Sequence, residues 1–264
     1  MSDPKEFIEK ASKFLKQQRE MYGDFSVKSL DMESSGTDIQ KAEIKEEKDL
    51  VTQNQDAGSA KEEQQLKENL TPVQRIAKCQ TLDELRALCE AADELKTDLE
   101  GTNVVFGVGN PNADLMIVGE APGYNEDQQG EPFVGQAGQL LDKIMEAIDF
   151  KREDIYIANI LKHRPPNNRD PKPEERQRSL PYLLRQIEII DPKLILCVGR
   201  ISATTLLNED TTLKSLRQKF HPFHGRELMA TYHPAALLRN QQWKRPTWED
   251  VQMLRKRYDE LVVD

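Results

Sequence analysis

Four short apolar runs alternate with helical patterns in the chain from residue 71 onward. The runs consist mostly of Leu, Ile, Val, Met and Ala, as in strands that are buried on both faces. They lie at residues 114–119, 154–159, 193–199 and 227–233. Because strands and helices alternate, the pattern predicts an α/β fold: a three-layer sandwich with a central, mostly parallel four-stranded sheet and helices on both faces.

The helices of this fold are predicted from apolar positions at helical spacing. They lie at residues 71–79, 81–95, 138–148, 172–190, 201–207 and 248–262. Thr81 and Glu84 have the spacing of a capping box, and Pro173 suits the first turn of a helix. The predicted α/β domain therefore extends over residues 71–264.

The first 70 residues have a different pattern. Residues 1–23 predict an amphipathic helix, with Phe7, Ile8, Phe14 and Leu15 on one face. This helix either packs on its own domain or docks on a protein partner. Residues 24–70 contain few large apolar side chains and no sustained period, which predicts a disordered acidic linker. We expect the domain to fold without this segment.

Composition limits the function classes. The net charge of −9 divides into about −5 before residue 71 and about −4 after it, so a nucleic-acid site needs a local basic patch. Three cysteines without a C-x-x-C pair suit a reducing cytosol. No signal peptide or membrane-spanning run is evident, so we expect a cytoplasmic, monomeric protein without membrane contact.

Three of the predicted strands end in polar sequence. Because the carboxyl ends of parallel strands meet at one edge of a sheet, these segments are expected to converge there and form a ligand site. They are "GEAPGYNEDQQGEPFVGQAG" at residues 119–138, "NILKHRPPNNR" at 159–169 and "YHPAALLRN" at 232–240.

The first segment carries an acid and an aromatic ring in unusual places. Glu120 directly follows a buried strand, and the glycines around it allow backbone N–H groups to face a ligand. Phe133, between Pro132 and the next helix, offers a ring for stacking. The alternatives are that Phe133 belongs to the core and that Glu120 caps the following turn.

The second and third segments add hydrogen-bonding and basic groups. Asn159 both donates and accepts, as reading the edge of a base requires, although it also suits a turn. His233 at a strand end suits hydrogen bonding to developing negative charge. The nearby cations offer a local positive patch or a solvated surface, and the two leucines offer a wedge into stacked bases or a helix docked on the core. These residues are Lys162, Arg164, Arg169, Leu237, Leu238 and Arg239.

Together the three segments resemble the uracil-DNA glycosylase superfamily, specifically the family 4 enzymes. The resemblance spans about residues 72–262 and rests on "GEAPGYNEDQQGEPFVGQAG", "YIANILKHRPPNNRDP" and "MATYHPAALLRN" in that order. It implies a base-excision DNA repair hydrolase that acts on uracil-containing DNA. Such an enzyme cleaves the bond between uracil and deoxyribose and leaves an abasic site.

The resemblance also implies a role for each site residue. Glu120 corresponds to the acid that positions water and offsets the cationic sugar, and His233 to the histidine that faces uracil O2. Phe133 corresponds to the ring that stacks on uracil. The other base-binding positions are Gly119, Ala121, Glu126, which guards against the thymine methyl, and Asn159, which reads the Watson–Crick edge. Arg164, Arg169, Leu237, Leu238 and Arg239 are expected to contact DNA.

The family 4 pattern fails at its iron–sulfur ligands. The four cysteine positions correspond here to Cys89, Ala92, His163 and Ser179. One thiolate of four is too few for a [4Fe–4S] cluster, so we expect the protein to work without a cofactor. A residual zinc site at Cys89 and His163 would need outside ligands. Two alternatives for the function stay open: a non-catalytic DNA- or base-binding module, or a glycosylase for another deaminated base.

Overall fold

The computed structural model describes residues 70–262. The predicted helix at 1–23 and all but the last residue of the predicted linker at 24–70 lie outside the described residues. Within residues 70–262, no helix has both the length and the apolar character needed to cross a membrane.

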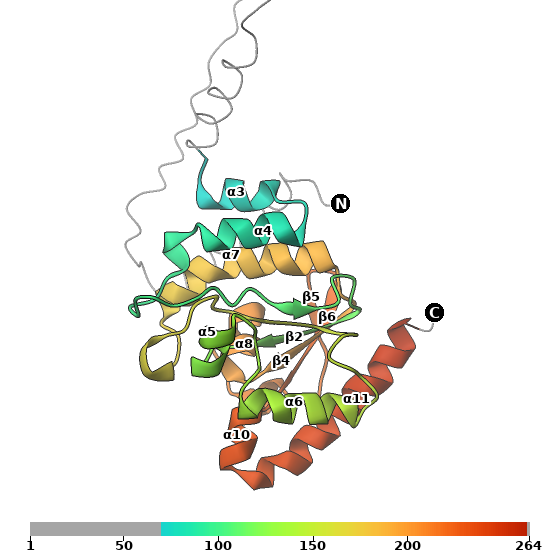
Figure 1. The fold of residues 1–264 in the computed structure, drawn as a ribbon. Coiled ribbons are helices and arrows are strands. Elements are labelled where there is room, and N and C mark those ends of the chain that lie inside the picture. Colours follow the sequence, from blue (N-terminus) through green and yellow to red (C-terminus); the bar gives the residue numbers. More distant parts are fainter. Residues whose placement is uncertain (1–69, 263–264) are drawn as a thin grey trace, which may run out of the picture.

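The centre of the molecule is a sheet (Figure 1). It has six strands in the order β1-β3-β2-β4-β6-β5. The four inner strands are parallel and correspond to the four predicted runs, whereas the two edge strands pair antiparallel. The prediction of four strands is therefore wrong, because it missed both edges. The strands are β1 (Val108–Gly109), β2 (Leu115–Gly119), β3 (Tyr156–Asn159), β4 (Leu194–Val198), β5 (His221–Phe223) and β6 (Arg226–Thr231).

The inner strands are apolar throughout because both of their faces are covered. Successive side chains of a strand point to opposite faces, so neighbouring residues enter different cores. In β2, Val118 belongs to one core and Ile117 to the other; in β4, Cys197 and Leu196 divide in the same way. This arrangement accounts for continuous apolar runs where a half-exposed sheet would show alternation.

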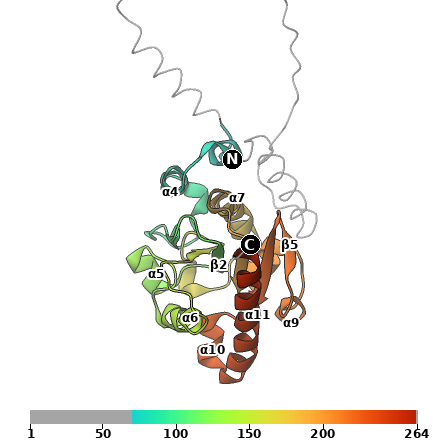
Figure 2. The ribbon, with the colours of Figure 1, turned by 90° about the vertical axis from the view of Figure 1, so that its right-hand side faces the viewer.

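Helices lie on both faces of the sheet (Figures 1 and 2). The core on one face includes residues of α3, α4, α7 and α8, and the core on the other face includes residues of α6 and α11. The bounds of these helices are α3 (Pro72–Lys78), α4 (Leu82–Glu90), α6 (Gln136–Glu146), α7 (Pro173–Ile190), α8 (Arg200–Leu207) and α11 (Lys244–Val262). Shorter helices are α5 (Tyr124–Gln129), α9 (Leu213–Leu216) and α10 (Pro234–Arg239), with 3₁₀ turns η1 (Asp93–Leu95), η2 (Pro166–Asn168) and η3 (Gln241–Trp243).

Local sequence explains where several helices begin. The capping box predicted at Thr81 is confirmed: its hydroxyl accepts from the Glu84 amide, and the Glu84 carboxylate accepts from the Thr81 amide. Pro173 occupies the first turn of α7, as predicted. The predicted helix at 81–95 is interrupted after Glu90, and η1 follows at Asp93–Leu95.

The register of the sheet brings the polar strand ends together. Gly119 at the end of β2 pairs with Asn159 at the end of β3, and Val198 of β4 pairs with Thr231 of β6. All four inner strands run in the same direction, so the segments after β2, β3 and β6 all leave the sheet at the edge formed by the carboxyl ends of these strands.

Candidate active site

A cavity of about 450 Å³ lies at this edge of the sheet. Its lining comes from the segments after β2, β3 and β6, as the sequence predicted. Eight predicted site residues take part: Glu120, Ala121, Glu126, Phe133, Asn159, Arg169, His233 and Arg239. The size suits a small ligand such as a single nucleobase with its sugar.

Glu120 carries a carboxyl group whose acidity is changed by burial. The pKa of Glu120 is raised to about 7, mainly by removal from water and also by the negative charge of Asp170, against the opposing effects of Arg200 and Arg176. Both carboxyl groups line the cavity. A carboxyl with a pKa near 7 is poised to accept a proton at neutral pH.

Asn159 presents an unsatisfied acceptor. The side chain is 2% exposed, and its Oδ1 has no hydrogen-bond partner among residues 70–262. A buried amide oxygen without a partner costs free energy, so such groups are rare unless a ligand completes them. The residue lines the cavity, and a ligand N–H is the group that would satisfy this oxygen.

His233 is held in one tautomer by the helix that it caps. Its Nδ1 accepts from the Ala235 amide at 3.2 Å, at the start of α10. The proton of the neutral ring therefore sits on Nε2. Desolvation, with a smaller effect of Arg239, lowers the pKa of His233 to about 4, so the ring is neutral at pH 7 and offers one N–H donor.

Phe133 forms a wall of the cavity next to His233. The two ring centroids lie 5.5 Å apart, and the Phe133 backbone has the unusual φ of 55°. The residue is 6% exposed and belongs to the core between the sheet and α6, so the core interpretation is confirmed. Gly119 allows this packing, because a Cβ at that position would lie 2.6 Å from Phe133 Cζ. Stacking of the Phe133 ring on a base stays a prediction.

Glu126 organises the backbone of the loop. Its Oε1 accepts from the amides of Val134 and Gly135, each at 2.9 Å, and its Oε2 accepts from the Gly123 amide at 3.2 Å. The carboxylate thereby joins the start of α5 to the start of α6. The Gly123-x-x-Glu126 spacing suits the contact at the start of α5, whereas no local signal predicts the contacts to Val134 and Gly135.

Comparison with known proteins agrees with this geometry. The sequence model of the Uracil DNA glycosylase superfamily matches residues 106–253, which is more than half of the chain. The chain belongs to this superfamily. All the strand ends that line the cavity lie within the matched residues.

Curated relatives extend the match. The chain is 48% identical over 158 residues to the type-4 uracil-DNA glycosylase of Archaeoglobus fulgidus, covering 57% of this chain and 78% of that protein. It is 42% identical over 164 residues to the type-4 uracil-DNA glycosylase of Sulfurisphaera tokodaii, covering 59% and 74%. With that of Thermotoga maritima it shares 40% identity over 159 residues, covering 58% and 82%.

The leucine and arginine positions predicted for DNA contact in this superfamily member differ in exposure. Leu238 is 45% exposed, and Arg239 is exposed and lines the cavity. Leu237 is 1% exposed, so its buried side chain does not suit the expected contact with DNA. One side of α10 packs inward, as the alternative of a docked helix required.

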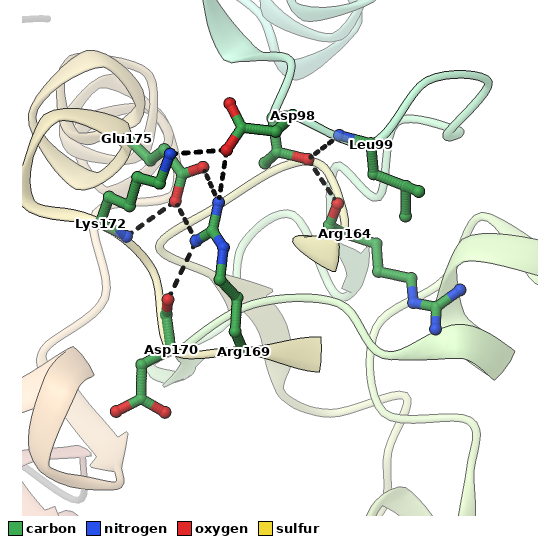
Figure 3. A network of polar contacts seen from close by, with 8 residues as sticks. Asp98, Leu99, Arg164, Arg169, Asp170, Lys172 and Glu175 are labelled. Carbon is green, nitrogen blue, oxygen red and sulfur yellow. Dashed lines mark hydrogen bonds and ion pairs between the residues drawn. The ribbon is translucent and has the colours of Figure 1, made fainter. Parts of the chain in front are cut away.

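Arg169 and Arg164 are held in different ways (Figure 3). Arg169 makes a bidentate pair with Glu175, at 2.8 and 2.6 Å, and also reaches Asp98 at 3.3 Å, so acidic partners offset its charge. The Arg164 guanidinium points away from this network, and its Nε donates to Asn168 at 2.7 Å.

Lys162 contradicts its predicted place in the basic patch. The side chain is fully buried, and its Nζ donates to the carbonyls of Phe106 and Asn159 and to Gln186 Oε1. Desolvation lowers the pKa of Lys162 to about 8. This residue supports the backbone of β3 from inside the protein and offers no charge to DNA.

The four positions that correspond to cluster ligands are also buried. Ser179 Oγ donates to the Ile160 carbonyl at 2.7 Å, and His163 Nδ1 lies 2.9 Å from Thr102 Oγ1. Cys89 is fully buried among apolar side chains of its core, and burial raises its pKa to about 12. Ala92 has no ligand atom. The donor set therefore does not fit a [4Fe–4S] cluster, which needs thiolates.

The cavity contains residues that sequence reasoning did not single out. Tyr124, Asn168 and Asp170 all contribute to its lining. Tyr124 stands four residues after Glu120, and the other two lie in the polar segment after β3. These three residues lie in or next to segments that were expected to converge at the strand ends, and this position in the sequence was the signal that could have identified them.

Proposed function

We propose that this chain is a uracil-DNA glycosylase of base-excision repair, which hydrolyses the bond between uracil and deoxyribose in DNA and leaves an abasic site. The observation that carries the proposal is the convergence of Glu120, Asn159 and His233 on one cavity at the strand ends. Membership of the superfamily and the names of the type-4 relatives support the same activity.

Asn159 selects the base. Uracil offers N3–H as a donor and O4 as an acceptor, whereas cytosine reverses both. The buried, unpartnered Oδ1 is suited to accept the N3–H of uracil, and the amide NH₂ would then donate to O4. Cytosine in the same pose leaves unpaired groups on both sides, which disfavours its binding.

His233 stabilises the leaving group. When the bond between C1′ and N1 breaks, the electron pair moves onto the uracil ring and negative charge develops at O2. The neutral imidazole donates Nε2–H to that oxygen, and its tautomer is set in advance by the Ala235 amide. A preorganised donor of this kind lowers the barrier by about 3–4 kcal/mol.

Glu120 acts on the sugar side. The departing base leaves C1′ with oxocarbenium character, which a nearby carboxylate stabilises. Water adds to C1′, and its proton passes to Glu120. This step needs the ionised carboxylate, so the pKa of about 7 sets the pH range in which the site works.

The base must leave the DNA stack before it enters the cavity. Flipping costs a few kcal/mol, which stacking of uracil on Phe133 partly offsets. Leu238 and Arg239 are exposed on α10, and Arg239 lines the cavity, which supports a role for both in filling the gap in the stack. Leu237 is left out of this role because it is buried.

No step of this scheme uses a metal or an iron–sulfur cluster. We propose that packing around Cys89 and internal hydrogen bonds at Ser179 and His163 have taken over the structural role of the cluster. A cytoplasmic location and a monomeric state remain expectations from the sequence.

Excision by the purified protein tests the proposal. Labelled oligonucleotides with one uracil, single-stranded or paired with adenine or guanine, are incubated with the protein without added metal and then treated with alkali. We expect cleavage at the uracil position and release of free uracil. Hypoxanthine- and xanthine-containing strands test the alternative of another deaminated base. A folded protein that binds these strands but cleaves none would instead be a binding module.

A further inference from the structure

Tyr124 is an exposed aromatic residue at the edge of the cavity. Its side chain is 57% exposed, compared with 45% for Leu238 and 41% for Trp248, the other exposed large apolar residues among those described. Tyr124 begins α5 and contributes to the cavity lining. Neither Asn159 nor His233 needs this ring, so the proposed excision chemistry leaves it without a role.

Arg164 fixes one face of this ring. Its guanidinium carbon lies 5.0 Å from the centroid of the Tyr124 ring, in a cation–π arrangement. Arg164 is itself held from two sides: its Nε donates to Asn168 Oδ1, and its carbonyl accepts from Thr97 Oγ1 at 2.6 Å. The ring is oriented by a cation on one face, and its large exposure leaves the rest of the ring open to solvent.

The loop that carries Arg164 is built to keep this position. Asn167 and Asn168 have φ values of 54° and 52°, a left-handed conformation that asparagine tolerates better than most residues. This tight turn aims Asn168 back at Arg164. Two segments far apart in sequence, α5 and the loop after β3, thereby contact each other beside the cavity.

A flat ring backed by a cation matches the chemistry of a nucleobase on its phosphate backbone. Bases stack on exposed aromatic side chains irrespective of sequence, and a neighbouring guanidinium attracts phosphate. We propose that Tyr124, backed by Arg164, is a binding subsite that stacks the unpaired base adjoining the flipped uracil. This inference rests on the proposed function, because the uracil must occupy the cavity next to it.

The subsite predicts a preference for unpaired substrate. In duplex DNA the base next to the uracil stays in the helical stack and is not available to Tyr124. In single-stranded DNA that base is free, and stacking on an exposed ring strengthens binding about tenfold. Tyr124 therefore contributes to single-stranded uracil sites and little to duplex sites.

The test combines substitutions of Tyr124 with removal of single bases from the DNA strand. Tyr124→Ala removes the ring and Tyr124→Phe keeps it. Trp248→Ala is the matched control, because it truncates another exposed aromatic residue that does not line the cavity. The strands are single-stranded uracil oligonucleotides with a tetrahydrofuran spacer replacing the base on the 5′ or the 3′ side. Fluorescence anisotropy gives Kd, and single-turnover excision gives the rate.

We expect Tyr124→Ala to weaken single-stranded binding about tenfold and duplex binding much less, with Tyr124→Phe and Trp248→Ala close to wild type. One of the two spacers should produce the same loss in the wild type, and combining it with Tyr124→Ala should add nothing further. Equal losses on single-stranded and duplex DNA, or additive losses with both spacers, would overturn the subsite. Wild-type excision of uracil decides the proposed function separately, since a wild-type enzyme that excises uracil with no Tyr124 effect refutes only the subsite.

Discussion

Two regions with buried polar side chains differ in whether those side chains find hydrogen-bond partners within the protein. In the cavity at the strand ends, Asn159 Oδ1 has no partner among residues 70–262, and Glu120 is desolvated to a pKa of about 7. At the positions that correspond to cluster ligands, Ser179 donates to Ile160 and His163 lies against Thr102. Both regions lie in the part of the chain that resembles the family 4 enzymes.

This difference in hydrogen bonding distinguishes a ligand-binding site from a region that only stabilises the fold. A buried polar group satisfied inside the protein stabilises the fold, whereas one left unsatisfied at the wall of a cavity costs stability unless a ligand pairs with it. By this criterion the cavity has the character of a binding site, whereas the side chains at the positions that correspond to cluster ligands are satisfied within the core. Substitutions in the two regions should therefore affect different measurements: catalysis in the first, stability in the second.

The largest effect is expected at His233. His233→Asn keeps a side chain that can cap α10 and removes the Nε2–H donor. We expect the single-turnover rate of uracil excision to fall about 10²- to 10³-fold, because uracil O2 loses its donor. The melting temperature should change little. A rate close to that of the wild type would show that His233 does not face the leaving group.

A smaller loss is expected at Asn159. Asn159→Ala leaves the uracil N3–H and O4 without partners, so the excision rate should fall about 10- to 100-fold. Asn159→Asp should also lose uracil excision sharply, and assays on cytosine-containing strands measure whether the changed edge admits that base. Retention of wild-type activity in Asn159→Ala would remove this residue from base recognition.

The pH dependence sharpens the assignment of Glu120. The carboxylate must be ionised to act, so kcat/KM should fall about tenfold for each pH unit below 7 and level off above it. Asp170→Asn removes a charge that raises this pKa, so the midpoint should move to lower pH, whereas the profile of Glu120→Gln should lack this midpoint. Because the pKa is raised, the protonated form favours the fold, and this contribution to stability is lost as pH rises through about 7. A flat profile in the wild type between about pH 5.5 and 8 would contradict the role of Glu120.

The smallest effects are expected at Cys89. Cys89→Ala removes one buried sulfur atom, and we expect the free energy of unfolding to fall by about 1 kcal/mol with excision unchanged. Cys197→Ala is the matched control, since Cys197 lies in β4, is equally buried and does not correspond to a cluster-ligand position. Similar losses in both variants, measured by urea denaturation, are the expected result. Loss of activity in Cys89→Ala alone would show that this thiol still has a special task.

The sequence was most informative where a local pattern decides the structure. The apolar runs predicted the four inner strands, and the polar segments that follow three of these strands predicted the place of the cavity. The edge strands β1 and β5 were missed because they are two and three residues long and carry no apolar run. Their pairing depends on the neighbouring strand rather than on their own composition.

The errors in the basic patch have a tertiary origin. A lysine in a polar segment is ordinarily exposed, but Lys162 is buried because Phe106 and Gln186, 56 and 24 residues away in sequence, supply acceptors for its Nζ. Arg169 is offset first by Glu175, six residues away, and also by Asp98, 71 residues away. Leu237 and Leu238 are adjacent in sequence, and only the packing of α10 decides which of them is exposed.

The central claim is that the cavity at the strand ends excises uracil in a protein in which packing has replaced the cluster. Measuring the iron content together with the excision rate tests this claim most directly. Anaerobically purified protein should be colourless, without broad absorbance near ~400 nm and without stoichiometric iron. It should excise uracil at a rate that neither chelators nor added iron change. Brown protein with about four irons per chain, and a rate that rises with iron content, would contradict the account.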